Sequence, residues 1–157
     1  MSLSKKISFS YLVKPFYFPN RNCTKLYISE IFKDHNLELN LINYVFCTDK
    51  YLLNLNTQYL NHNFYTDILT FDLSDEQMLT ADIFISVERA EENSLVYNVS
   101  KLLEIRRLLI HGALHLCGYK DKTPTEREKM SAMEEFYLNK FFVSRETEKT
   151  TFLVKRK

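Results

Sequence analysis

Two histidines and one aspartate stand at a spacing that suits a metal ion. His111 and His115 are four residues apart in a segment whose pattern predicts a helix, so both side chains lie on one face, one turn apart. Asp121 follows in the chain, and Gly118 between them is the residue type that ends helices, which lets the chain fold back. Two imidazoles and one carboxylate leave a coordination position open, as in catalytic zinc sites. We therefore expect an open transition-metal site whose metal-bound water performs hydrolysis.

The same segment allows other interpretations. Two histidines on an apolar helix can be core residues with ring nitrogens hydrogen-bonded to the backbone. Gly112 stands where helical zinc proteases carry the glutamate of His-Glu-x-x-His, so protease chemistry would lack its general base. A glycine inside a helix costs about 0.5–1 kcal/mol relative to alanine, which suggests a close approach by another backbone or a ligand. Glu104 lies on the same helical stripe and can orient a ligand or be a solvated charge.

Periodicity and capping residues predict the elements that must position these residues. Alternating apolar and polar residues predict two strands at 6–13 and 37–46, and two short strands are predicted at 67–72 and 81–86. Helices are predicted at 20–35, 49–60, after Ser86, 100–117 and 123–142, with Asp49, Ser86, Ser100 and Thr123 as N-caps. In the last helix the inward residues are expected to be Met130, Met133, Phe136 and Tyr137.

This order of elements predicts an α+β domain. We expect a small mixed four-stranded sheet packed with about five helices. The second half of helix 100–117 is apolar on every side apart from its two histidines, and a helix of that kind lies inside a protein. The metal site should therefore lie at the end of a buried central helix.

Composition limits the functional class. The length of 157 residues favours one domain over residues 1–142, followed by a charged, mobile tail at 143–157. The net charge of +1 lacks the strong basic excess of many nucleic-acid binders but does not exclude RNA binding through a local basic patch. Its three cysteines, Cys23, Cys47 and Cys117, share no close spacing that would indicate disulfides or a cysteine zinc site. No apolar run approaches the ~18 residues of a membrane span. We expect a reduced, cytoplasmic protein with no membrane partner and no nucleotide cofactor.

The histidine segment resembles the signature of a known family. The run His111-Gly-Ala-Leu-His-Leu-Cys-Gly-Tyr119 is similar to His-Gly-x-Leu-His-Leu-x-Gly-Tyr-Asp-His of the YbeY family of bacterial rRNA maturation factors. Two further segments agree in order and spacing: Thr66-Asp-Ile-Leu-Thr-Phe71 resembles Thr-Asp-Val-Leu-Ser-Phe, and Ala81-Asp-Ile-Phe-Ile-Ser86 resembles Gly-Asp-Ile-x-Ile-Ser. The resemblance implies a metal-dependent, single-strand-specific endoribonuclease in rRNA maturation and ribosome quality control.

Within this resemblance, His111, His115 and residue 121 are implied as ligands of one divalent metal, with zinc favoured and nickel or iron possible. The family's last signature histidine is Asp121 here; a carboxylate binds zinc but also suits non-haem iron. The family also carries an arginine where this chain has Leu60, so RNA contacts are expected to differ. The implied partners are rRNA precursors and the ribosome or ribosomal proteins.

Further residues are candidates for the cleft and for RNA. Asp67 and Ser86 follow predicted strand ends and can line a cleft, although both types are also common in turns and caps. Arg107, one turn before His111, and His62 are the candidate RNA contacts. The alternatives in function are a non-catalytic ribosome-assembly factor with a structural metal, or another metal-dependent hydrolase such as a peptidase.

Overall fold

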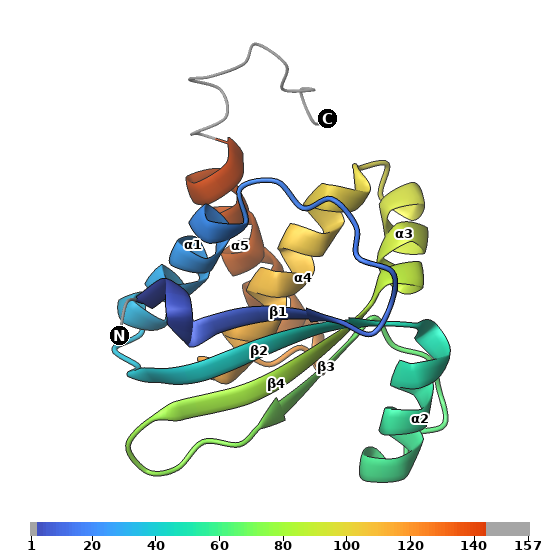
Figure 1. Ribbon diagram of the computed structural model, residues 1–157, viewed down its shortest axis with the longest axis horizontal. Helices are drawn as coiled ribbons and strands as arrows, with labels where there is room; N and C mark the ends of the chain where they lie inside the picture. Colours follow the sequence, from blue (N-terminus) through green and yellow to red (C-terminus); the bar gives the residue numbers. More distant parts are fainter. Residues whose placement is uncertain (1–2, 144–157) are drawn as a thin grey trace.

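The computed structural model describes residues 3–143, which form one mixed sheet with helices around it (Figure 1). The strands are β1 (Ile7–Tyr11), β2 (Leu39–Cys47), β3 (Ile68–Asp72) and β4 (Leu79–Ser86). The α-helices are α1 (Arg21–Asp34), α2 (Asp49–Leu60), α3 (Val87–Val96), α4 (Lys101–Leu116) and α5 (Pro124–Leu138). A 3-10 turn, Leu3–Lys6, precedes β1, and a π-helical turn, Asn139–Val143, follows α5. The predicted tail lies outside the described residues, apart from residue 143.

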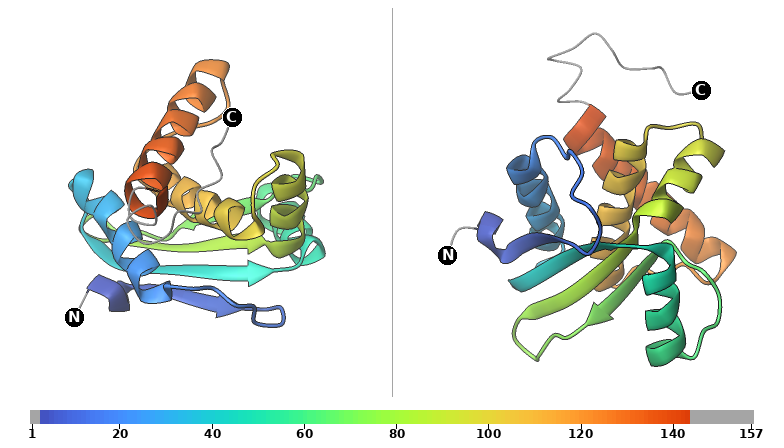
Figure 2. Two further views of the ribbon diagram at one scale, coloured as in Figure 1. Left: turned by 90° about the horizontal axis from the view of Figure 1, so that it is seen from above. Right: turned by 45° about the vertical axis from the view of Figure 1, so that its right-hand side comes forward.

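The four strands are ordered β1-β2-β4-β3. Strands β1, β2 and β4 are mutually parallel, whereas β3 returns antiparallel along β4 at the sheet edge. Figures 1 and 2 show α1, α4 and α5 gathered on one face of this sheet, while α2 stands apart and packs on β3, β4 and α3. The predicted α+β class, with a four-stranded mixed sheet and five helices, is confirmed.

The core lies between the sheet and helix α4. Alternate residues of the two central strands face it and are fully buried: Ile42, Tyr44, Phe46, Ile83 and Ile85. Along α4, Leu109, Ile110, Ala113 and Leu114 are also fully buried, as the all-apolar second half of this helix predicts. The histidines are thus carried on a helix that is fixed from several sides.

Two details of the helices differ from the sequence predictions. Helix α2 is capped by Thr48, whose side chain accepts a hydrogen bond from the Tyr51 amide, and Asp49 is the first helical residue. Phe136 of α5 is 52% exposed instead of inward. The caps at Ser86, Ser100 and Thr123 are confirmed, and Thr123 forms the expected capping box with Glu126. Among the described residues, no helix is long and apolar enough to cross a membrane.

Candidate metal centre

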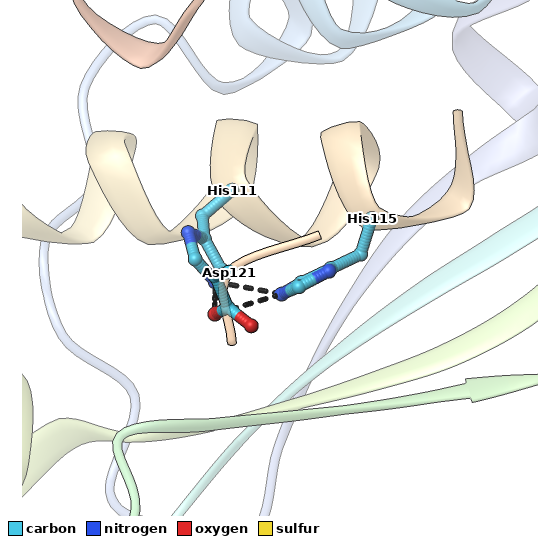
Figure 3. Close-up of side chains that lie close together, drawn as sticks. All are labelled: His111, His115 and Asp121. Carbon is cyan, nitrogen blue, oxygen red and sulfur yellow. Dashed lines mark hydrogen bonds and ion pairs between the residues drawn. The ribbon is translucent and has the colours of Figure 1, made fainter. Parts of the chain in front are cut away.

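Helix α4 presents both histidines on one side, near its C-terminal end (Figure 3). The Nε2 atoms of His111 and His115 lie 2.9 Å apart, and their rings meet edge to face at 86°. Their side chains are 13% and 28% exposed, so this is a half-buried position at the margin of the core. The helical spacing therefore brings the two imidazoles to one point, as predicted.

Gly112, between the two histidines, sets how closely α4 approaches the sheet. A Cβ atom at this position would lie 3.0 Å from Cγ2 of Ile83 and 3.2 Å from Cδ1 of Ile68. The close neighbours are therefore side chains of β4 and β3, in place of the backbone or ligand suggested by the sequence. The glycine lets the histidine-bearing turn pack tightly on the strands.

Gly118 ends the helix and orients His115. Its φ of 98° is a conformation that side-chain-bearing residues rarely adopt, and no atom lies within 4 Å of an added Cβ, so conformation alone requires the glycine. The Gly118 amide donates to the His115 carbonyl and the Tyr119 amide to the Leu114 carbonyl, which is a Schellman ending. This turn brings the Tyr119 carbonyl within 2.9 Å of His115 Nδ1.

Asp121 reaches the histidines from the loop after this turn. One carboxylate oxygen, Oδ2, lies 3.4 Å from His111 Nε2 and 3.3 Å from His115 Nε2 (Figure 3). The loop is fixed by Arg127, whose guanidinium donates to the Lys122 carbonyl at 2.7 Å, and by the capping box that starts α5. The Asp121 side chain is 39% exposed, so the site is open to solvent on this side.

The three residues form a group that can hold a metal ion, since one ligand atom of each lies within 4.8 Å of the others. Ligands at about 2.0–2.1 Å in a tetrahedron lie about 3.3–3.4 Å from one another. The two distances from Asp121 Oδ2 to the histidine Nε2 atoms match this ligand–ligand separation. The two Nε2 atoms, 2.9 Å apart, need to separate by a few tenths of an ångström. The donor set and its geometry therefore fit a transition metal with one position left open.

A buried polar network stands behind His111. Its Nδ1 atom lies 2.9 Å from Oε1 of Glu134, a residue of α5 whose side chain is only 7% exposed. Arg107 donates to Glu134 Oε2 at 3.0 Å and, through Nε, to Glu104 Oε2 at 2.9 Å. Glu104 is 1% exposed, which excludes the solvated charge among its two sequence interpretations. Asn93 joins the network by donating to Glu104 and to Asp67.

Glu134 was not found by sequence reasoning. The buried residues of α5 are Met130, Glu134, Tyr137 and Leu138, so this carboxylate occupies the apolar stripe of the helix at i, i+4, i+7 and i+8. A charged residue on an inward stripe is the signal that could have identified it. Of the residues expected to face inward, Met130 and Tyr137 are buried, whereas Phe136 is exposed.

The remaining candidate residues differ in whether their position supports the role suggested by the sequence. Arg107 is held by carboxylates on all three of its nitrogens, which argues against a role as an RNA phosphate contact. Ser86 is fully buried and accepts from the Arg89 amide, so the structure favours the cap over the cleft residue. Asp67, 28% exposed and 3.8 Å from Arg107, borders the network. His62 is exposed in the loop after α2 and stacks on Phe64.

Burial and neighbouring charges shift the protonation of this cluster. Burial, together with the proximity of His111, lowers the pKa of His115 and favours the neutral ring that a metal requires. Burial raises the pKa of Glu134, but the hydrogen bond from His111 and the charge of Arg107 outweigh it, so the net shift is downward. Burial opposes the charge of Arg107, yet Glu104 and Glu134 raise its pKa above the usual range.

The sequence matches a family model and several named proteins. A model of the family described as endoribonuclease YbeY matches residues 19–142. The protein named endoribonuclease YbeY in Karelsulcia muelleri is 42% identical over 135 residues, which cover 86% of this chain and 90% of that protein. Its counterpart in Flavobacterium johnsoniae is 39% identical over 137 residues, covering 87% and 98% of the two chains.

A solved structure has a similar fold. The solution structure of TM1509 from Thermotoga maritima superposes with a TM-score of 0.61 at 22% identity, over 96% of this chain and 99% of that one. At that identity the likeness supports the fold alone, whereas the family model and the two relatives cover most of the sequence, including all three proposed ligands. This chain belongs to the YbeY family of endoribonucleases.

Proposed function

We propose that this protein is a metal-dependent endoribonuclease, specific for single-stranded RNA, in which His111, His115 and Asp121 hold the catalytic metal. Its family membership makes it an endoribonuclease of rRNA processing. The convergence of three donor atoms on a half-buried, solvent-open point is the observation that supports this metal assignment. A closed structural site would instead be expected to carry a fourth protein ligand.

The donor set favours zinc. Imidazole nitrogens and one carboxylate oxygen are common ligands of catalytic zinc, and the same three donors also bind nickel or ferrous iron. The carboxylate at position 121 is a harder ligand than an imidazole, which brings iron closer in affinity than a three-histidine site would. We assign zinc first, with nickel and iron as the alternatives that metal analysis distinguishes.

The residues around the ion have separate tasks. The Tyr119 carbonyl and the Glu134 carboxylate each face the Nδ1 atom of a histidine, which leaves Nε2 of both rings for the metal. The exposed side of Asp121 leaves room for water and an RNA phosphate beside the ion. A bound dication supplies Lewis acidity toward that water or toward the 2′-hydroxyl of the RNA, and toward the scissile phosphodiester.

Three residues are candidates for contacts with the RNA substrate. Asp67 borders the network directly before β3 and stays a candidate for lining the cleft. His62 and Phe64 stack in an exposed loop, and exposed rings of this kind can stack on unpaired bases. We propose rRNA precursors as the substrate, the ribosome or ribosomal proteins as partners, and the cytoplasm as the location.

Metal analysis beside ribonuclease assays tests the proposal. We expect about one zinc, nickel or iron per wild-type chain, lost in His111→Ala and Asp121→Ala, and cleavage of single-stranded RNA that disappears with the metal. An RNA duplex of the same sequence should be spared. Product ends distinguish the two nucleophiles, because a 2′,3′-cyclic phosphate requires attack by the 2′-hydroxyl. Metal-free wild-type protein that still cleaves RNA would contradict the metal assignment.

A further inference from the structure

Two buried carboxylates share one guanidinium directly behind the candidate metal centre. Glu104 and Glu134 come from different helices, α4 and α5, and their side chains are 1% and 7% exposed. Arg107 bridges them, donating to Glu104 through Nε and to both oxygens of Glu134 through one terminal nitrogen, at 3.2 and 3.0 Å. Two carboxylates paired with the single guanidinium of Arg107 leave an excess of negative charge in a region that is mostly shielded from solvent. Such an excess is costly unless another positive charge lies close by.

The excess charge faces His111. Of the two carboxylates, Glu134 is the one in contact with this ring, with 2.9 Å between Oε1 and Nδ1. A carboxylate at Nδ1 accepts the ring N–H, which fixes the tautomer with its lone pair on Nε2 and makes that nitrogen a stronger donor toward a cation. The opposite nitrogen, Nε2, is the atom that lies beside His115 and Asp121. The cluster therefore adds negative charge to a position where a dication can balance it.

Arg107 fixes the direction of this carboxylate. It contacts both oxygens of Glu134, so the carboxylate cannot rotate away from His111 without losing an ion pair. Arg107 is itself held by Glu104, on the same helix one turn earlier. The Glu104, Arg107 and Glu134 side chains thus form a continuous connection that ties α5 to the histidine-bearing turn of α4.

We propose that Glu134 is a positioning residue for metal binding, held in place by Arg107 and acting through the ring of His111. This inference rests on the proposed function for its metal but adds a residue outside the ligand set and outside the family signature. It also reassigns Arg107, which the sequence suggested as an RNA contact, to a role inside the protein. The consequence is that zinc affinity depends on a residue that never touches the ion.

Zinc affinity of purified protein tests this role without any RNA. We expect Glu134→Gln to weaken Zn²⁺ binding about 10–100-fold in competition with a chromophoric chelator, the usual effect of losing such a partner. Gln keeps the size of the side chain but not the charge that faces Arg107 and His111. The matched control is Glu135→Gln, the same substitution one residue along α5 at an exposed position, which should bind zinc as wild type does.

Two further measurements separate positioning from a structural role. If Glu134→Gln does not fold, as circular dichroism would reveal, Glu134→Asp keeps the charge but withdraws the oxygen from Nδ1, and the same loss of zinc affinity is expected. RNA cleavage by the folded variant should return toward the wild-type kcat at saturating zinc, with KM for RNA unchanged. Wild-type zinc affinity in a folded Glu134 variant would overturn the inference. Wild-type protein that binds zinc without cleaving RNA would instead overturn the proposed function alone.

Discussion

The carbonyl oxygen of Tyr119 lies 2.9 Å from Nδ1 of His115, four residues earlier in the chain. This contact exists because the helix ends in a Schellman turn at Gly118, which carries Tyr119 back across the last turn of α4. The same turn sends the chain toward Asp121. The end of helix α4 therefore orients His115 and places Asp121 near the histidines.

Gly118→Ala should weaken both the fold and the metal site. A side chain at a φ of 98° is strained, and a left-handed residue with a Cβ costs about 1–2 kcal/mol. Chemical unfolding of the chelator-treated protein measures this loss, and chelator competition measures the zinc affinity. Gly118→Asn is the control, since asparagine tolerates left-handed backbone better and should lose less stability. Equal stability of the alanine variant and wild type would contradict the role of the turn.

Gly112 and Ile83 should be energetically coupled. A Cβ at position 112 meets Cγ2 of Ile83 at 3.0 Å, and Ile83 is fully buried, so it has little room to move. Ile83→Ala removes the two nearest atoms, leaves Cδ1 of Ile68 at 3.2 Å, and opens a cavity. Gly112→Ala should therefore be less harmful in the Ile83→Ala background than in wild type, with a coupling of about 0.5–3 kcal/mol.

A double-mutant cycle of unfolding free energies measures this coupling. The matched control replaces Ile42, which is buried in neighbouring β2 and contributes none of the three atoms nearest to a Cβ at position 112. The Gly112→Ala effect should be the same with and without Ile42→Ala. Additive effects in the Ile83 cycle would mean that the glycine is not required by packing.

Much of the fold around the site could be predicted because its signals are local. Ser86, Ser100 and Thr123 cap helices through bonds three residues away, and Gly118 ends α4 through its own backbone conformation. His111 and His115 share a face because the helical period is fixed. Such signals act within a few residues, and a single sequence carries them directly.

The contacts behind the ligands could not be predicted in the same way. Glu134 reaches His111 from 23 residues downstream, and only the packing of α5 on α4 brings them together. Because α5 packs on the core through the face that carries Glu134, Phe136 points outward to solvent. The sequence suggests Arg107 as an RNA contact because its ion pair with Glu134 forms only through that packing, although Glu104 lies on its own helix. Side-chain contacts between elements follow from tertiary geometry, which the helical pattern leaves open.

Acid should destabilise the metal-free protein in two steps. The pKa of His115 is lowered by burial and by His111, so below its ordinary value of about 6.5 the folded chain binds fewer protons than the unfolded chain. Stability then falls as the pH falls through this range. The lowered pKa of Glu134 has the same sign at lower pH, below about 4.3.

Urea unfolding in the presence of a chelator, at pH 7.5 and pH 5.5, measures the first step. His115→Gln removes the titrating group and should flatten the dependence between these two values. His62→Gln, the same substitution at an exposed histidine in the loop after α2, is the control for the substitution itself. A pH dependence that His115→Gln leaves intact would assign it to another group.

The three cysteines should differ sharply in reactivity. Burial raises the pKa of Cys117 to about 12, and burial with the charges of Asp49 and Glu88 does the same for Cys47, whereas Cys23 is exposed. At pH 8 about one in 10⁴ of the buried thiols is ionised, and the thiolate is the reactive form. Iodoacetamide at pH 8 should therefore modify Cys23 and spare the other two.

Peptide mapping by mass spectrometry identifies the modified residues, and denatured protein should be modified at all three. In Cys23→Ser, native protein should take up no label on the same timescale. Because Cys117 caps α4 directly before Gly118, its labelling reports opening of the turn that delivers Asp121. Zinc should slow that labelling further if the ion holds the loop. Equal labelling of Cys117 and Cys23 would contradict the ordered Schellman turn that ends α4.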